Sequence, residues 1–241
     1  MPPGEYAIQF IPYSCHSNGG PPNRRFPHRH RTPGFTTFSS LLRMATKYRF
    51  QHIRSQILLD LPPAYPTKLS EYEGSSCLGE AIFRSPLPHP NLVLDLFVSC
   101  KVSFALPFAY YRACIAGDPA SSDVGAGETT LSPETLETAL RGKARLKTEE
   151  VQLAREVAFQ DCASWGSCSK KSSDGRALIF DWIHPKATTQ SGILERGDIP
   201  GPGYCSRCLQ AFQQELSKAK KDIWENLPSY FDLPPWGNTV N

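Results

Sequence analysis

The sequence predicts a mainly α-helical fold, and three observations support this expectation. Apolar residues recur every three or four positions in several separate segments, which is the spacing of one face of an α-helix. Prolines and serines stand where helices of ordinary length would begin or end. Only residues 177–183 form a modest strand candidate. We therefore expect a multi-helix assembly preceded by a disordered, proline-rich N-terminus.

The N-terminal segment, residues 1–35, contains seven prolines and no hydrophobic period. Such a segment cannot bury enough apolar area to offset the entropy lost on ordering, so we expect it to be disordered. Residues 24–31 gather arginines and histidines, which form either a solvated basic arm or a contact for an acidic partner.

The net charge of +3 lies in residues 1–40, which hold four arginines and one glutamate. The rest of the chain carries 22 basic and 22 acidic side chains. A neutral body gives no electrostatic reason to expect nucleic-acid binding, so we regard a nucleic-acid partner as unfavoured.

The first ordered element is expected to begin near Phe38. Two apolar stripes follow with spacings of 3, 4, 3 and then 3, 4, 4, separated by a break near Arg49. This break predicts two consecutive helices rather than one long helix, and Pro62 and Pro63 end the second. The stripes are Phe38, Leu41, Ala45 and Tyr48, then Phe50, Ile53, Ile57 and Leu61.

The next segment, residues 62–90, contains six prolines and is expected to be a loop. Pro90 suits the first turn of a helix. Residues 92–100 are apolar nearly all round, so that helix should be buried. A further helix is expected over residues 104–115.

Small residues dominate positions 117–130, which predicts a linker. Beyond it, Ser132 and Pro133 occupy the cap and first position of another helix, and residues 146–159 are also helical in pattern. The clearest amphipathic helix covers residues 209–227, and Pro228 ends it. The chain therefore divides into an arm (1–35), a helical region (36–116), the linker (117–130) and a helical extension (131–241).

The sequence contains no run of roughly 18 uncharged apolar residues, so no membrane span is expected. Its first residues lack the basic region followed by an apolar one that a secretory signal requires. We therefore expect an intracellular protein of the cytoplasm or nucleus. In such a compartment the eight cysteines are expected to be thiols or metal ligands rather than disulfides.

Four cysteines bracket part of the extension as two pairs. The second pair has the two-residue spacing usual in zinc sites and precedes the amphipathic helix, whose first N–H groups favour a thiolate. The first pair is separated by five residues, which exceeds the usual spacing, and His184 lies between the pairs as a substitute ligand. Three alternatives stay open: one structural zinc ion, reduced structural thiols, or a disulfide. The four are Cys162, Cys168, Cys205 and Cys208.

No catalytic motif is present in the sequence. The nucleophile elbow G-x-S-x-G, the phosphate loop, the dinucleotide fingerprint and H-E-x-x-H are all missing. The remaining cysteines are uninformative, and Cys100 and Cys114 are expected to be small core residues. We therefore expect no enzymatic activity, and zinc is the only cofactor to consider.

The segment from Leu41 to Leu61 resembles the last two helices of a BTB/POZ domain. That family shows Leu-Leu-x-x-Ala-x-x-Tyr-x-x-x-x-Leu at the same spacing, which is matched by Leu41, Leu42, Ala45, Tyr48 and Ile53. The later segments resemble the BTB-domain-containing proteins of mushroom-forming fungi, including the cysteine pair before the last helix. These segments are residues 65–67, 89–90, 105–114 and 223–236, so the resemblance covers about residues 36–236.

The resemblance implies the helical C-terminal end of a BTB-like domain followed by a helical extension. A complete BTB domain carries a strand-rich half before these helices, and that half supplies most of the homodimer surface. Here the proline-rich arm stands in its place, so homodimerisation and docking to cullin-type ubiquitin ligases are in doubt. The chain looks like an N-terminally truncated member of the family.

Two surface features are expected from this arrangement. Helices that a strand-rich half would cover should leave an exposed apolar patch near residues 38–61. The ending, residues 227–236, is either a tail that packs Phe231 and Trp236 into the helical core or a docking peptide anchored by its aromatic residues.

The sequence therefore favours a non-catalytic protein–protein interaction module, an adaptor or scaffold with protein partners and no membrane contact. Two alternatives stand beside it. One is a zinc-stabilised nuclear regulator that touches nucleic acid through the basic arm. The other is a truncated remnant without function.

Overall fold

The computed structural model describes residues 34–74, 83, 87–116, 131–159, 162, 168, 171–183, 192–197 and 203–237. Every regular element within these residues is a helix, which confirms the mainly α fold. The expected linker and residues 1–33 of the expected arm lie outside the described residues. The α-helices are α1 (Phe35–Lys47), α2 (Gln51–Leu58), α3 (Leu69–Glu73), α4 (Pro90–Ser99), α5 (Leu106–Ile115), α6 (Pro133–Phe159), α7 (Ser173–Ile183) and α8 (Ser206–Tyr230).

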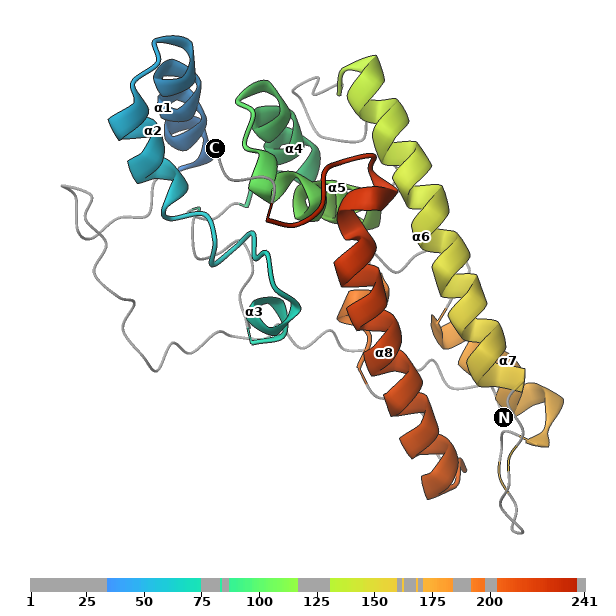
Figure 1. Cartoon of the computed structure of the whole chain (residues 1–241). Helices are drawn as coiled ribbons and strands as arrows, with labels where there is room; N and C mark the ends of the chain where they lie inside the picture. The colour runs from blue at the N-terminus through green and yellow to red at the C-terminus, as the bar shows by residue number, and fades with distance from the viewer. Residues whose placement is uncertain are drawn as a thin grey trace, which may run out of the picture.

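The helices pack as a series of neighbours. Helices α6 and α8 are long and run side by side, and α5 packs against both of them (Figure 1). Helix α4 packs on α5, and α1 packs on α4 and α2. The α1–α2 pair therefore lies at the edge of the molecule, with α4 between it and the α5–α6–α8 body.

Helices α1 and α2 form a hairpin that turns at Arg49, as the break between the two apolar stripes predicts. Phe38, Leu42 and Ala45 make the buried side of α1, and Ile57 is the buried residue of α2. These residues join a continuous core with α4 and α5.

Two arginines fasten the hairpin to α4. Arg43 forms an ion pair with Asp95 at 2.9 Å between Nη2 and Oδ2. Arg54 donates hydrogen bonds to the backbone carbonyls of Cys100 and Lys101 at 3.1 and 3.0 Å. The polar contacts of Arg43 and Arg54 thus add to the apolar core that the hairpin shares with α4.

Helices α1, α4 and α8 each end in a Schellman motif without a glycine. The residue after each cap has a positive φ: Arg49 at 57°, Lys101 at 53° and Asp232 at 55°. In α1 the N–H of Phe50 bonds the carbonyl of Ala45 at 2.9 Å, and α4 and α8 repeat this six-residue closure. These bonds satisfy carbonyls that a helix end leaves without donors.

Helices α4 and α5 supply the centre of the core. Pro90 begins α4 as expected, and the ring Nδ1 of His89 accepts the N–H of Asn91 at 3.3 Å. Both helices are buried on most sides, as the nearly continuous apolar sequence predicts. Tyr72, Phe108 and Trp224 meet there with ring centroids 5.4–5.7 Å apart, which joins α3, α5 and α8.

Helix α6 is longer than the sequence pattern indicates. The sequence predicts one helix opening at Pro133 and a second helical segment over residues 146–159, but a single helix covers Pro133–Phe159. Ser132 Oγ accepts the N–H of Thr135 at 3.3 Å, which confirms the expected cap. Gly142 lies against Phe231, and a Cβ at this position would overlap the Phe231 ring. The missing side chain allows α6 and the end of α8 to approach closely.

The strand candidate at residues 177–183 is wrong, because these residues form most of α7. Gly175, Ile179 and Ile183 are buried at four-residue spacing, and α7 packs against α6. The run is rich in β-branched and aromatic residues, which imitates a strand in sequence. A helix satisfies its own backbone hydrogen bonds, whereas a lone strand would leave them without partners.

Helix α8 continues two residues beyond its expected end at Pro228. Proline has no N–H, so Pro228 leaves the carbonyl of Trp224, four residues earlier, without its helical donor. The indole N–H of Trp236 donates to that carbonyl at 2.7 Å. The Trp224 and Trp236 rings also stack with centroids 5.7 Å apart. The tail therefore folds back onto α8, and Phe231 is fully buried.

Candidate functional site

The four cysteines that the sequence singles out come together in the structure. The Sγ atoms of Cys162, Cys168, Cys205 and Cys208 all lie within 4.8 Å of one another. Cys162 and Cys205 have an Sγ–Sγ distance of 3.8 Å, and the cysteines of the cluster are free thiols. Four thiolates around one tetrahedral zinc at about 2.3 Å would stand roughly 3.8 Å apart. The cluster can therefore hold a metal ion with little movement.

Helix geometry brings the second pair together. Cys205 is the N-cap residue of α8, and Cys208 lies three residues later in its first turn. Residues three apart on a helix face the same side, so both cysteines lie on one side of the helix start. Cys162 follows the end of α6, and Cys168 precedes α7, so the α6–α7 connection carries the first pair. His184, the substitute ligand, lies outside the described residues.

The surroundings of the cluster favour the deprotonated, thiolate form of one cysteine. The backbone N–H of Cys208, aided by neighbouring thiols, lowers the pKa of the Cys205 thiol to about 6. Burial, together with hydrogen bonds from the other cysteines, raises the pKa of Cys208 well above its usual range. The N–H of Cys205 donates to Sγ of Cys168 at 3.3 Å. Such N–H donors stabilise negative charge on sulfur.

The remaining described cysteines differ from this cluster. Cys100 and Cys114 are each buried in the core, as expected. Burial raises the pKa of the Cys114 thiol to about 12, and its Sγ donates to the carbonyl of Ala139 at 3.3 Å. Neither residue has the environment of a reactive thiol or metal ligand. Cys15 and Cys77 lie outside the described residues.

The five residues that match the BTB pattern divide between core and surface. Leu42 and Ala45 are buried, whereas Leu41, Tyr48 and Ile53 are exposed by 40%, 57% and 43%. Trp236 is half-buried on Trp224, which agrees with the tail rather than the docking-peptide alternative.

An exposed apolar surface extends over the hairpin, which confirms the expected patch. We call it the α1–α2 apolar face and define it by Leu41, Met44, Tyr48, Phe50 and Ile53, each at least 40% exposed in the described part of the chain. Leu41 and Met44 of α1 lie roughly 90° around the helix from the buried Phe38, Leu42 and Ala45. The apolar arc of α1 is therefore much wider than the part that the body covers.

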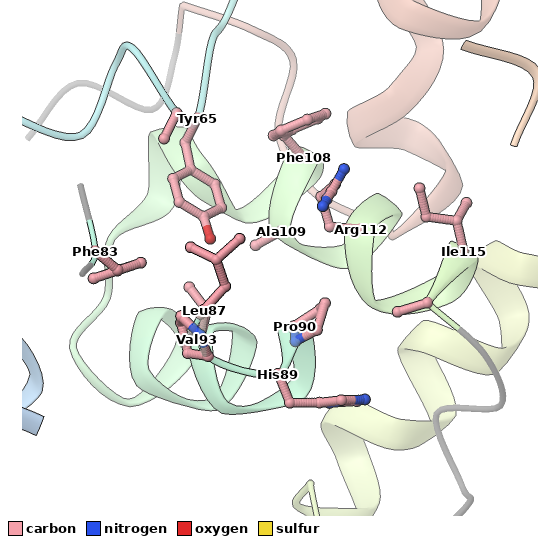
Figure 2. Close-up of a pocket in the computed structure, with 13 residues that line it drawn as sticks. Tyr65, Phe83, Leu87, His89, Pro90, Val93, Phe108, Ala109, Arg112 and Ile115 are labelled. Carbon is pink, nitrogen blue, oxygen red and sulfur yellow. The ribbon is translucent and has the colours of Figure 1, made fainter. Parts of the chain in front are cut away.

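A cavity of about 330 Å³ lies between α4, α5 and the segment that precedes α4 (Figure 2). We call it the α4–α5 cavity. Sequence reasoning missed it because its walls belong to segments that resemble ordinary core. One signal was present: Arg112 is the only charged residue within the apolar helix α5.

Comparison with known proteins adds no relatives, because no family model, no curated protein and no solved structure matches this chain significantly. No helix within the described ranges is both long and apolar enough to cross a lipid bilayer. The basic cluster at residues 24–31, which the nucleic-acid alternative requires, lies outside the described residues.

Proposed function

We propose that this chain is a non-catalytic protein-interaction module, which binds a partner protein through the α1–α2 apolar face and is stabilised by one zinc ion. The observation that carries the proposal is the exposure of five large apolar side chains within thirteen residues of chain. Large exposed apolar patches mark interaction surfaces on proteins.

The shape of the hairpin supports this role. Leu41 and Met44 of α1 and Tyr48, the C-cap residue of α1, follow one another at spacings of three and four, so they form a stripe that a partner could cover. The rings of Tyr48 and Phe50 lie 6.0 Å apart and extend the stripe across the turn. Aromatic residues and methionine are enriched in the cores of protein interfaces.

The resemblance to BTB proteins points to the same surface. In that family these two helices pack against a strand-rich half, and the α1–α2 apolar face belongs to the segment that carries the resemblance. Adaptor or scaffold activity is therefore the form of protein binding that we propose.

The zinc ion would be structural. Four cysteine ligands complete a tetrahedral shell and leave no open position for a water or substrate. The ion would tie the start of α8 to the connection between α6 and α7, so it would hold the ends of three helices together. A role in stability rather than chemistry follows from the closed ligand set.

Site-specific photo-crosslinking tests the interaction surface. A photoreactive amino acid at Tyr48 in the full chain, in the cells that make it, should give one discrete protein adduct. The matched control is the same amino acid at Leu178 of α7, which is also exposed and apolar but lies outside the face. Met44→Glu should remove the Tyr48 adduct. Equal adducts at both positions, or none at Tyr48, would contradict the proposal.

Native mass spectrometry tests the metal. The full chain should carry one zinc ion, and a chelator should remove the ion and lower the melting temperature together. Cys205→Ser should abolish zinc binding, whereas the control Cys100→Ala should retain it. A metal-free wild-type chain with an unchanged melting temperature in chelator would refute the structural zinc.

A further inference from the structure

The α4–α5 cavity has the composition of a ligand site. Its walls include Phe83, Val93 and Phe108, which are at most 3% exposed, and Leu87 and Ile115 complete the apolar lining. Two strong hydrogen-bond donors, Tyr65 and Arg112, also line the cavity. Ligand pockets commonly combine mostly apolar walls with a few converging polar groups.

The hydroxyl of Tyr65 is directed into the cavity. Figure 2 shows it pointing toward Leu87 and Ala109, which also line the cavity. The residue is only 8% exposed, and none of the described residues forms a hydrogen bond with this hydroxyl. Burial raises the pKa of Tyr65 well above its usual range, so the phenol is a neutral donor at physiological pH. A ligand oxygen that accepted a hydrogen bond from this hydroxyl would give the phenol a partner.

The guanidinium of Arg112 faces the same space beside Phe108 (Figure 2). Its charge lowers the pKa of Tyr65 against the larger effect of burial, so the two groups share one electrostatic environment. Among the described residues no carboxylate pairs with Arg112. A half-buried arginine without an anion attracts one, and a carboxylate matches the planar fork of a guanidinium.

We propose that the α4–α5 cavity binds a small monocarboxylic acid with one aromatic or branched apolar group. Arg112 and Tyr65 would hold the carboxylate, and Phe83, Val93 and Phe108 would enclose the apolar group. At the roughly 30 Å³ that one water molecule occupies in the liquid, the volume of about 330 Å³ corresponds to about eleven waters, which leaves room for a small organic molecule. This inference is independent of the proposed protein-binding function, because the cavity and the α1–α2 apolar face share no residue.

Calorimetric titration of the full chain with matched probes tests the inference. The probe 3-phenylpropionate has the required size and charge, and 3-phenylpropionamide has the same shape without the charge. We expect the acid to bind at least tenfold more tightly than the amide, since hydrogen bonds to charged groups are the stronger class. Acetate, which lacks the apolar group, should bind at least tenfold more weakly than the acid.

Variants locate the site. Arg112→Gln should weaken 3-phenylpropionate binding at least tenfold, and Tyr65→Phe should weaken it about fivefold. The matched control Arg155→Gln removes the same charge from an exposed position on α6 and should leave binding unchanged. Circular dichroism shows which variants fold, and the comparison of acid with amide requires no variant at all.

Three outcomes would overturn the proposal. Equal affinity for acid and amide would remove the role of the carboxylate, and an unchanged affinity in folded Arg112→Gln would place binding elsewhere. A peptide ending in phenylalanine with a free carboxylate provides the third test. If it binds more than tenfold more tightly than the free acid, the ligand is a protein terminus and not a small molecule.

Discussion

The α1–α2 hairpin and the α6–α8 pair are both amphipathic, yet the apolar residues at the end of α8 are covered more completely than those of the hairpin. The tail after α8 folds back, so Phe231 fills the space beside Gly142 and Trp236 stacks on Trp224. On the hairpin, Met44 and Tyr48 are more than half exposed. The difference shows that an apolar stripe in the sequence predicts which face of a helix is suited to packing. It does not predict which element packs against that face.

Arginines attach both regions to their neighbours. The hairpin is fixed to α4 by Arg43 and Arg54, whose partners are a carboxylate and two backbone carbonyls. Arg141 and Arg145 of α6 pair with Asp232 at the end of α8, and the fully buried Phe231 ring lies against Gly142 at the same join. Exposed ion pairs contribute little to folding stability, whereas buried rings contribute a great deal. We therefore expect the free energy of unfolding to depend more on buried rings such as Phe231 than on these exposed arginine contacts.

The largest expected effect is on the α6–α8 side. Phe231→Ala should lower the free energy of unfolding by about 3–5 kcal/mol, because it removes a fully buried ring that stacks on Tyr110. The matched change Phe50→Ala on the hairpin should cost less than about 1 kcal/mol, since that ring is half exposed. Urea denaturation of both variants measures the difference. Similar losses would show that the hairpin is covered in solution.

A smaller effect is expected for Trp236→Ala. The change removes the ring stack on Trp224 and the hydrogen bond to its carbonyl, so about 2 kcal/mol should be lost. Trp236→Phe keeps a ring but no N–H and should recover roughly half of that loss. A melting temperature unchanged in Trp236→Ala would restore the docking-peptide alternative for the tail.

The pH dependence of stability tests the polar contacts at the end of α8. A hydrogen bond from Arg145, together with its charge and that of Arg141, lowers the pKa of Asp232. Its ionised form therefore favours folding above the ordinary aspartate pKa of about 4, and this benefit disappears as the pH falls through the lowered value. Asp232→Asn should thus be less stable than wild type at neutral pH.

The melting temperatures of wild type and Asp232→Asn should converge as the pH falls below about 4, because the carboxylate then becomes protonated. Asp60→Asn, just after the end of α2, removes the same charge on the hairpin side and serves as the control. Thermal melts from about pH 2 to about pH 7 measure both variants. A constant difference between wild type and Asp232→Asn across this range would contradict the assigned ion pairs.

The smallest effect on stability is expected on the α1–α2 apolar face. The double change Met44→Ser and Tyr48→Ser should alter the free energy of unfolding by less than about 1 kcal/mol, because both side chains are exposed. The same change should reduce the binding of a hydrophobic dye to the folded chain. A loss as large as that of Trp236→Ala would mean that these residues are buried in solution, and the comparison of the two regions would fail.

Much of the fold follows from residue spacing alone. The hairpin break at Arg49, the buried helix after Pro90 and the cap at Ser132 all depend on local signals, and the structure has each of them. Helix α7 was not predictable in this way, because its β-branched and aromatic run fits either class of structure. Its packing against α6 decides the outcome, and a local pattern does not contain that contact.

The candidate site was likewise predictable only in part. The spacing of Cys205 and Cys208 indicates a pair of ligands, but the convergence with Cys162 and Cys168 depends on how the α6–α7 connection returns to α8. The α4–α5 cavity could not be predicted from the sequence. Its two donors, Tyr65 and Arg112, are 47 positions apart in the sequence and meet only through packing.

The helix ends without glycine have a consequence for engineering the chain. Arg49 and Lys101 adopt the left-handed conformation, which costs residues with a side chain roughly 1 kcal/mol relative to glycine. Both side chains are exposed, so glycine at either position would relieve this strain without removing a buried contact. Glycine substitution at the ends of α1 and α4 should therefore raise the free energy of unfolding. Both positions lie away from the cysteine cluster and the α4–α5 cavity.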